Sequence, residues 1–257
     1  MIHVTPVQTG LLCLAAFLGG TVDAIAGGGG IITVPALLAA GLPPHAALAT
    51  NKGQSVWGSA AAIVRYARSG LLDWRAARLS FPLAVAGGAA GALLVLQLSP
   101  GVLRPLVLVL LVVAAILVAL IRVPEVAEER PRHRPALILG AIALVVGFYD
   151  GFFGPGTGTF LIAGYVAFLG ISLAHASADA KVVNGASNFA ALVVFASRGA
   201  VVWSVAAPML LAQVAGGWTG AHLAIRGGNR FIRLVVVLVA LALVVKVARD
   251  LYLHGGN

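Results

Sequence analysis

The chain contains two copies of one sequence pattern, and this duplication constrains its fold more than any other feature. The first copy has Gly20-x-x-Asp23 with Gly27 and Gly29, and 127 residues later the chain repeats Gly147-x-x-Asp150 with Gly154 and Gly156. Beyond these motifs the offset is 129, which pairs Lys52 with Lys181. Repeats of this length are too long for a solenoid unit. They are typical of a duplicated membrane domain, the plan of many secondary transporters.

Composition supports a membrane location. Of the 257 residues, 60% are hydrophobic and 10% are charged, and the mean hydropathy is +1.02. Ten apolar runs follow one another: 7–26, 31–42, 46–64, 77–98, 102–121, 135–153, 157–169, 174–196, 205–225 and 232–251. All but 31–42 and 157–169 approach the roughly 20 residues that a helix needs to cross a bilayer. We therefore predict an all-α polytopic membrane protein.

The net charge of +9 does not indicate nucleic-acid binding, because the basic residues collect between the apolar runs. That distribution sets the orientation of membrane helices. Cys13 is the single cysteine, which excludes an intrachain disulfide and a cysteine-based metal site, and we expect no cofactor. The first apolar run continues into Asp23 and a glycine cluster, so we expect a membrane helix there rather than a cleaved signal.

The two short runs decide the topology. If they re-enter, each copy has four spans and the copies are parallel; if they cross, each has five and the copies are inverted. Loop 65–78 holds four basic residues and its copy around 198–203 holds one, whereas around Arg104 and its copy near 226–233 the bias reverses. Under the positive-inside rule, opposite biases place homologous loops on opposite faces.

We therefore predict two inverted-topology repeats of about five transmembrane or partly spanning helices each, with both termini outside. The first repeat is residues 1–122 and the second is 136–257. The segment 123–135, which holds all three glutamates of the chain, is predicted to be a cytoplasmic hinge loop.

Two glycine clusters, 27–30 and 154–158, interrupt apolar stretches at matching positions of the two repeats. Glycine and proline end helices and leave backbone N–H and C=O groups unpaired, which a membrane tolerates only where protein or water supplies partners. The amino end of a broken helix favours an anion. The alternative is close helix packing, which we prefer for Gly87-Gly88-x-x-Gly91 and its copy. No phosphate-loop ending follows either cluster.

Lys52 and Lys181 lie within apolar helices, where a charge costs at least about 2.5 kcal/mol. We predict that both lysines supply positive charge to a central anion, with neighbouring amides and hydroxyls as hydrogen-bonding partners; the alternative is a lysine that snorkels to the membrane surface. The predicted substrate-binding residues are Gly27, Gly28, Gly29, Gly30, Asn51, Lys52, Gln54, Ser55, Gly154, Gly156, Thr157, Lys181, Asn184 and Asn188.

Asp23 and Asp150 have two interpretations. They are counter-charges that hold the lysines, or carboxylates that carry a proton. Ion pairing is favoured, because a lone carboxylate in apolar surroundings stays protonated. If one of them carries a proton, Asp150 is the better candidate, since Phe148, Phe152 and Phe153 surround it in the sequence.

Residues 22–35 (VDAIAGGGGIITVP), with Gly41-Leu-Pro-Pro44 and Ala49-Thr-Asn-Lys52, resemble the first-repeat signature of the TauE/SafE sulfite exporter family. Residues 147–158 (GFYDGFFGPGTG), with Lys181-x-x-Asn184-x-x-x-Asn188, resemble the second. The resemblance covers essentially the whole chain. It implies a permease of the bacterial inner membrane that exports sulfite, sulfoacetate or related sulfur-containing or organic anions.

One departure separates the two copies: Thr50-Asn51 before the first lysine becomes Asp179-Ala180 before the second. The two halves of the site are therefore not chemically equivalent. The lysines correspond directly, whereas polar ligands do not carry over from one half to the other.

Two other functions are alternatives to a carrier. An intramembrane hydrolase needs acid–base side chains at membrane depth, but the glutamates lie in the hinge, so we expect no enzyme. An anion channel has the same ingredients as a carrier, and the duplicated broken helices favour alternating access. The expected partners are a small anion and the lipid bilayer, not nucleic acid; a homo-oligomer is left open.

Overall fold

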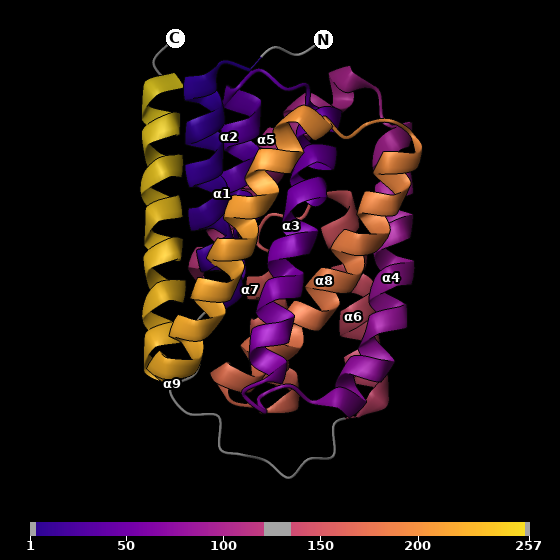
Figure 1. The fold of residues 1–257 in the computed structure, drawn as a ribbon, viewed down its shortest axis with the longest axis vertical. Coiled ribbons are helices and arrows are strands. Elements are labelled where there is room, and N and C mark those ends of the chain that lie inside the picture. Colours follow the sequence, from indigo (N-terminus) through magenta and orange to yellow (C-terminus); the bar gives the residue numbers. More distant parts are fainter. Residues whose placement is uncertain (1–3, 121–134, 255–257) are drawn as a thin grey trace.

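The computed structural model describes residues 4–120 and 135–254, and within these residues the chain is helical without a β-strand (Figure 1). The predicted all-α class is confirmed. The predicted hinge loop, 123–135, lies outside the described residues except for Pro135, which precedes the helix of the second repeat.

The helices follow the duplicated order of apolar runs. The first repeat contains α1 (Pro6–Ala26), α2 (Gly30–Ala39), α3 (Pro44–Ala67), α4 (Trp74–Gln97) and α5 (Pro100–Leu120). The second contains α6 (Ala136–Phe152), α7 (Thr157–Leu169), α8 (Leu173–Ser197) and α9 (Trp203–His254). The short runs form short helices, with 10 residues in α2 and 13 in α7.

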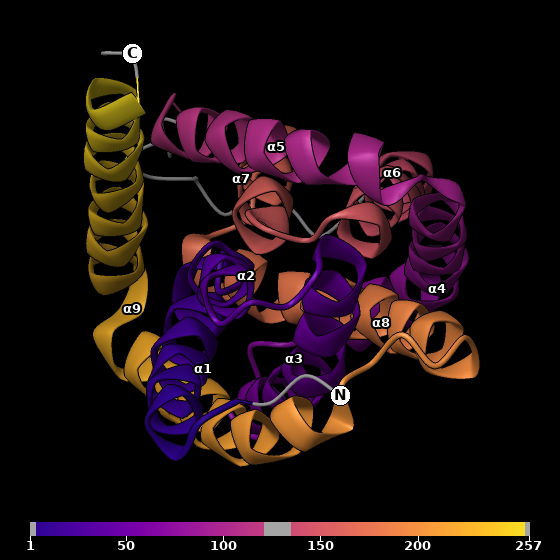
Figure 2. The ribbon, with the colours of Figure 1, turned by 90° about the horizontal axis from the view of Figure 1, so that it is seen from above.

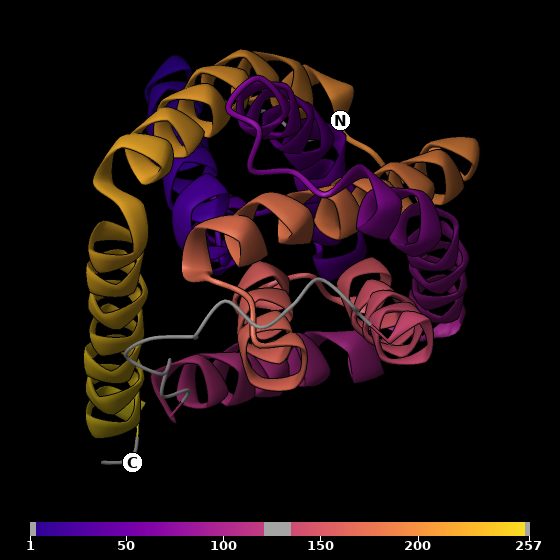
Figure 3. The ribbon, with the colours of Figure 1, turned by 90° about the horizontal axis from the view of Figure 1, so that it is seen from below.

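Helix α9, of 52 residues, covers the last two apolar runs as two helices that meet at a kink, so the two segments expected there are present. Gly228 interrupts it with a non-helical conformation, φ 61° and ψ −161°. At the offset of 129, Gly228 corresponds to Ser99, which separates α4 from α5. Figure 3 shows α9 turning sharply between its orange and yellow parts. The two repeats thus match element by element, with a glycine kink in place of a loop.

Within the described residues, three helices are long and apolar enough to cross a membrane by length and composition alone: α1, α4 and α8. Helices α2, α6 and α7 are apolar but shorter. Helix α3 has 24 residues, but its polar stretch at 51–55 keeps it out of the first group. Large apolar side chains face outward, among them Leu137 at 84% exposure and Leu211 at 72%, as expected for a surface in contact with lipid.

The two repeats interlock, so that helices of one repeat lie along helices of the other. Helix α1 lies along α9, and α4 lies along α6. Seen from above, α3 and α8 lie between these two pairs (Figure 2). Each outer pair therefore takes one helix from each repeat, and the central pair does the same.

Glycines make these contacts close. A Cβ atom added to Gly91 would lie 2.1 Å from the backbone oxygen of Phe148, and one added to its copy Gly220 would lie 2.3 Å from that of Thr21. Thr21 and Phe148 are themselves a repeat pair, so one contact occurs twice with the repeats exchanged. The packing role expected for Gly87, Gly88 and Gly91 is confirmed.

The inverted orientation of the repeats stays a prediction, which topology reporters can check. Reporters fused at Asp73, between α3 and α4, and at Gly199, between α8 and α9, should label opposite faces. Asp73 should report the cytoplasm, because loop 65–78 carries the larger positive charge. A cytoplasmic signal from both sites would replace the inverted arrangement with a parallel one of four spans in each repeat.

Candidate functional site

The predicted helix breaks are present at both glycine clusters. Helix α1 ends at Ala26 and α2 begins at Gly30, whereas α6 ends at Phe152 and α7 begins at Thr157. Four glycines in the breaks have positive φ: Gly27 at 68°, Gly28 at 126°, Gly154 at 99° and Gly156 at 86°. Residues with a side chain rarely adopt this conformation, which explains why glycine occupies these positions.

The two breaks meet inside the protein. A Cβ atom added to Gly27 would lie 2.2 Å from the Cα atom of Gly158, and one added to Gly30 would lie 3.2 Å from the Cα atom of Pro155. The backbones of the two repeats therefore touch at this crossing. The two clusters thus face each other, and helix ends from both repeats converge on one region.

Lys52 of α3 forms the first of two buried ion pairs. Its Nζ atom lies 2.9 Å from Oδ1 of Asp150 and 2.7 Å from Oδ1 of Asn188. The Lys52 and Asp150 side chains are each 2% exposed, and the Ser187 hydroxyl donates to the other carboxylate oxygen. A Cβ atom added to Gly154 would lie 2.9 Å from Nζ. The glycine therefore leaves room for the ammonium group.

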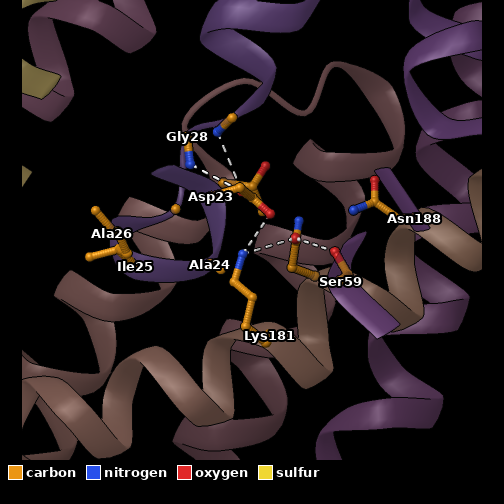
Figure 4. A network of polar contacts seen from close by, with 12 residues as sticks. Asp23, Ala24, Ile25, Ala26, Gly28, Ser59, Lys181 and Asn188 are labelled. Atoms are coloured by element: carbon orange, nitrogen blue, oxygen red, sulfur yellow. Dashed lines mark hydrogen bonds and ion pairs between the residues drawn. The ribbon is translucent and has the colours of Figure 1, made fainter. Parts of the chain in front are cut away.

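Lys181 of α8 forms the second pair (Figure 4). Its Nζ atom lies 2.8 Å from Oδ2 of Asp23 and 3.3 Å from Oδ1 of Asn184. The backbone N–H groups of Gly28 and Gly29 donate to the other oxygen of Asp23, at 3.2 Å and 3.4 Å. The amino end of α2, where the sequence predicts an anion, thus already binds a carboxylate of the chain itself.

Both ion pairs connect the two repeats. Lys52 of the first repeat pairs with Asp150 of the second, and Lys181 of the second pairs with Asp23 of the first. Both lysines are buried, so neither snorkels to the surface. Of the two interpretations of the aspartates, ion pairing is the one that matches this geometry. The pairs differ in access, since the Asp23 side chain is 13% exposed.

One face of α8 carries polar residues that contact both ion pairs. Lys181, Asn184 and Asn188 recur at helical spacing and span about two turns, or about 10 Å. Ser59 of α3 donates to Oδ1 of Asn184 at 3.2 Å, as Figure 4 shows. Ser59 was missed in the sequence, although the offset of 129 pairs it with Asn188. Ser187 was also missed, because its copy is Gly58 and shows no polar signal.

Two predicted ligands, Asn51 and Gln54, lie in a separate polar cluster. Asn51 accepts hydrogen bonds from Thr33 at 2.6 Å and from the Gln54 amide at 2.9 Å, rather than contacting a lysine. The hydroxyl of Ser55 has no partner among the described residues. Thr157 donates to the carbonyl of Gly154 at 2.6 Å and so closes the turn between α6 and α7.

Thr50 and Asp179 differ in type between the two copies, but they have equivalent roles. The Val202 N–H donates to the Thr50 hydroxyl at 3.1 Å, and the Asp73 N–H donates to the Asp179 carboxylate at 2.9 Å. Val202 and Asp73 are also a repeat pair, and each precedes a long helix. Both side chains therefore hold a loop of the other repeat instead of binding at the central site.

The end of α1 has a set of hydroxyl caps. Tyr66, Ser177 and Thr159 donate to the carbonyls of residues 24–27 at 2.7–3.0 Å. These carbonyls have no partner within the helix, so the hydroxyls satisfy groups that would otherwise be costly in a membrane. In the other repeat, the offset of 129 pairs Tyr66 with Phe195 and Ser177 with Leu48, and the offset of 127 beside the glycine cluster pairs Thr159 with Ile32, so all three positions are apolar. This cap therefore belongs to one repeat alone.

The site consists of two buried ion pairs. Two buried ammonium groups are each neutralised by a carboxylate, and amide and hydroxyl groups hold the remaining positions. Within the part of the chain that the structure describes, no group of three His, Cys, Asp or Glu side chains could hold a metal ion. An external anion that replaced a carboxylate beside either lysine would keep the ammonium group paired, and the displaced carboxylate would then need a proton, another cation or contact with water.

Comparison with known proteins gives one consistent result. The sequence model of a family described as "Sulfite exporter TauE/SafE" matches residues 12–247. A "Probable membrane transporter protein YfcA" of Escherichia coli K12 is 37% identical over 252 residues, covering 96% of this chain and 92% of the relative. Probable membrane transporters of Sinorhizobium sp. (37% over 239 residues, 93% and 92% covered) and Haemophilus influenzae (34% over 242, 93% and 94%) are similar. No solved structure gives a significant match.

Proposed function

The chain belongs to the TauE/SafE family of sulfite exporters, and from this premise we propose that it exports a small anion by alternating access, with Lys52 and Lys181 as the substrate ligands. Family membership makes it a multi-pass membrane transporter and points away from an enzyme. The proposed substrates are sulfite, sulfoacetate or related sulfur-containing or organic anions. The proposed site comprises the two ion pairs and the glycine crossing.

The reciprocal pairing of lysine and aspartate between repeats carries this proposal. A buried charge is costly unless it is paired, so each lysine needs a negative partner throughout the cycle. An anion that replaces Asp150 or Asp23 as that partner releases a link between the repeats. Substrate binding is thereby coupled to relative movement of the repeats, which alternating access requires.

Burial of the site favours a carrier over a channel. The side chains of Lys52 and Asp150 are 2% exposed, and the backbones cross in contact at Gly27 and Gly158. A channel requires a continuous aqueous path past its ligands. A carrier instead passes through a closed state in which the site is shielded from both faces.

Flux measurements in proteoliposomes test this function. Sulfite, sulfoacetate and small carboxylates are supplied at increasing concentration. A carrier gives uptake that saturates, and unlabelled anion inside the vesicles accelerates entry of labelled anion. Linear, unsaturated uptake without this acceleration would favour the channel, and equal flux in protein-free vesicles would reject transport of these anions.

Asp150→Asn tests how the pairs are used. The substitution removes the carboxylate that competes with substrate for Lys52, so the anion should stabilise the variant against heat more than it stabilises the wild type. Flux should fall, because the bound anion no longer has a carboxylate to displace it. Equal anion-dependent stabilisation in both proteins would contradict the exchange of partners.

The same variant separates the two interpretations of the aspartates. Flux is measured with an imposed pH gradient in wild type, Asp150→Asn and Asp23→Asn. A loss of gradient-driven flux in the Asp150 variant alone that is larger than its fall in flux without a pH gradient would assign the proton to Asp150, as the sequence favours. Gradient-driven flux that survives both substitutions would leave both aspartates as counter-charges.

A further inference from the structure

Gln213 of α9 is a buried polar residue that the ion pairs do not explain. It is 2% exposed, and its Oε1 atom has no hydrogen-bond partner among the described residues. The Oε1 atom of Gln54, which is fully buried, also lacks a described partner. An amide oxygen buried without a hydrogen bond destabilises a protein, and such groups are rare unless a ligand or water completes them.

The space around Gln213 is shaped by two glycines. A Cβ atom added to Gly58 of α3 would lie 2.5 Å from Cγ of Gln213, and one added to Gly20 of α1 would lie 3.1 Å from its Cδ atom. The glutamine side chain thus occupies the junction of α1, α3 and α9. Two helices lack side chains where it lies.

The other repeat shows that the fold does not need this amide. At the offset of 129, Ala84 of α4 corresponds to Gln213. Gly147, the copy of Gly20, approaches it closely, since an added Cβ atom would lie 3.0 Å from the backbone oxygen of Ala84. The equivalent junction therefore has Ala84 in place of Gln213 and Ser187 in place of Gly58. Gln213 adds a buried amide to one repeat, and its Oε1 atom has no hydrogen-bond partner among the described residues.

The helices that surround the two amides place them relative to the more accessible ion pair, Asp23–Lys181. Gly20, which Gln213 approaches, precedes Asp23 by three residues, about 4.5 Å along α1. Gln54 precedes Gly58 by four residues, so both lie on one side of α3. Gln213 thus contacts α1 about one helical turn from Asp23, whose side chain is 13% exposed, and contacts α3 about one turn from Gln54.

We propose that Gln213 and Gln54 form a neutral hydrogen-bonding subsite for the uncharged polar end of the transported anion, whose charged end pairs with Lys181. This inference rests on the proposed function. The ligand class is a small organic anion that carries a hydroxyl, amide or similar group about 5 Å from its charge, the length of one helical turn. The amide oxygen without a partner on either glutamine can accept a hydrogen bond from that group: a hydroxyl donates to one of the two oxygens, and a primary amide can donate to both.

Anions matched in charge test the subsite. Ethanesulfonate and 2-hydroxyethanesulfonate differ by one terminal hydroxyl, as do propionate and 3-hydroxypropionate. Dissociation constants are obtained from the rise in unfolding temperature of the purified protein with anion concentration. The wild type should bind the hydroxylated member of at least one pair about tenfold more tightly. Gln213→Met, which keeps the length of the side chain, should bind both members with the affinity of the unhydroxylated one.

The unfolding temperature without ligand shows whether Gln213 serves to bind a ligand or to stabilise the fold. Gln213→Met and Gln213→Ala, the latter reproducing Ala84, should unfold at the wild-type temperature or above it, because each removes an unsatisfied buried amide. A lower unfolding temperature of both variants would assign Gln213 to packing and overturn the subsite. Ser80→Ala is the control, since Ser80 of α4 is also buried and its hydroxyl has no described partner. It should leave the preference unchanged.

The outcomes distinguish this inference from the proposed function. Anions that bind and depend on Lys181, but with no preference for a hydroxyl, would reject the subsite alone. A preference that persists in Gln213→Met would do the same. If no anion stabilises the wild type and none is transported, both the subsite and the anion site are rejected.

Discussion

Lys52→Ala and Lys181→Ala are each expected to abolish or strongly weaken anion binding in a protein that still inserts into the membrane. Each substitution removes the ammonium group from a partly or fully desolvated pair. Loss of one member of such a pair typically costs about 2 to 5 kcal/mol, which is about 30- to several-thousand-fold in affinity. The measurement is the anion-dependent rise in unfolding temperature of the purified protein.

Paired variants separate binding from folding. Lys52→Ala leaves the Asp150 carboxylate buried without its counter-charge, which is itself destabilising by about 3 to 5 kcal/mol. The double variant Lys52→Ala/Asp150→Asn removes both charges and should recover much of this stability without recovering anion binding. Wild-type anion affinity in both single lysine variants would reject the site.

Gly158→Ala is expected to disrupt the protein as a whole. The added Cβ atom would lie 2.4 Å from the Cα atom of Gly27, and a backbone atom cannot move aside as a flexible side chain does. Overpacking of a core costs about 1 to 3 kcal/mol and sometimes more. We expect a large fall in unfolding temperature, or loss of the monodisperse fraction on size-exclusion chromatography in detergent.

Gly164→Ala is the matched control in the same helix, α7. Its added Cβ atom would meet Ile142 at 3.6 Å, an ordinary van der Waals contact. Alanine has a higher helix propensity than glycine by about 1 kcal/mol, so this variant should be as stable as the wild type or more stable. Equal behaviour of the two variants would show that the crossing is not tightly packed.

The fold was predictable from the sequence to the level of segments and their breaks. The offsets of 127 and 129 residues identified the copies, and glycines beside Asp23 and Asp150 located the interrupted helices. The exception is α9, where the kink at Gly228 replaces an expected loop. Glycine permits both a loop and a sharp bend within a helix, and the choice depends on packing that the sequence does not record.

The candidate site was predictable in its charges but not in its geometry. Because Lys52 and Lys181 lie in apolar helices, each is expected to pair with a negative charge. No local sequence pattern shows which aspartate pairs with which lysine. Asn51 and Gln54 were placed at the lysines because they are close in sequence. Their side chains leave α3 in another direction, towards Thr33. Gln213 was missed because its copy is Ala84, and duplication reveals only what both repeats retain.

The pairing of α1 with α9 and of α4 with α6 has a consequence for biosynthesis. Helix α1 is made first, but the helix along which it lies begins at Trp203, nearly 200 residues later. Contacts so distant in sequence form slowly, because a long loop must close before they are gained. The first repeat therefore enters the membrane before the helices of the second repeat that will pack on its glycine surfaces have been made. We therefore expect that neither repeat acquires its native packing in isolation, and that two separately expressed halves acquire it only when they are made in the same cell.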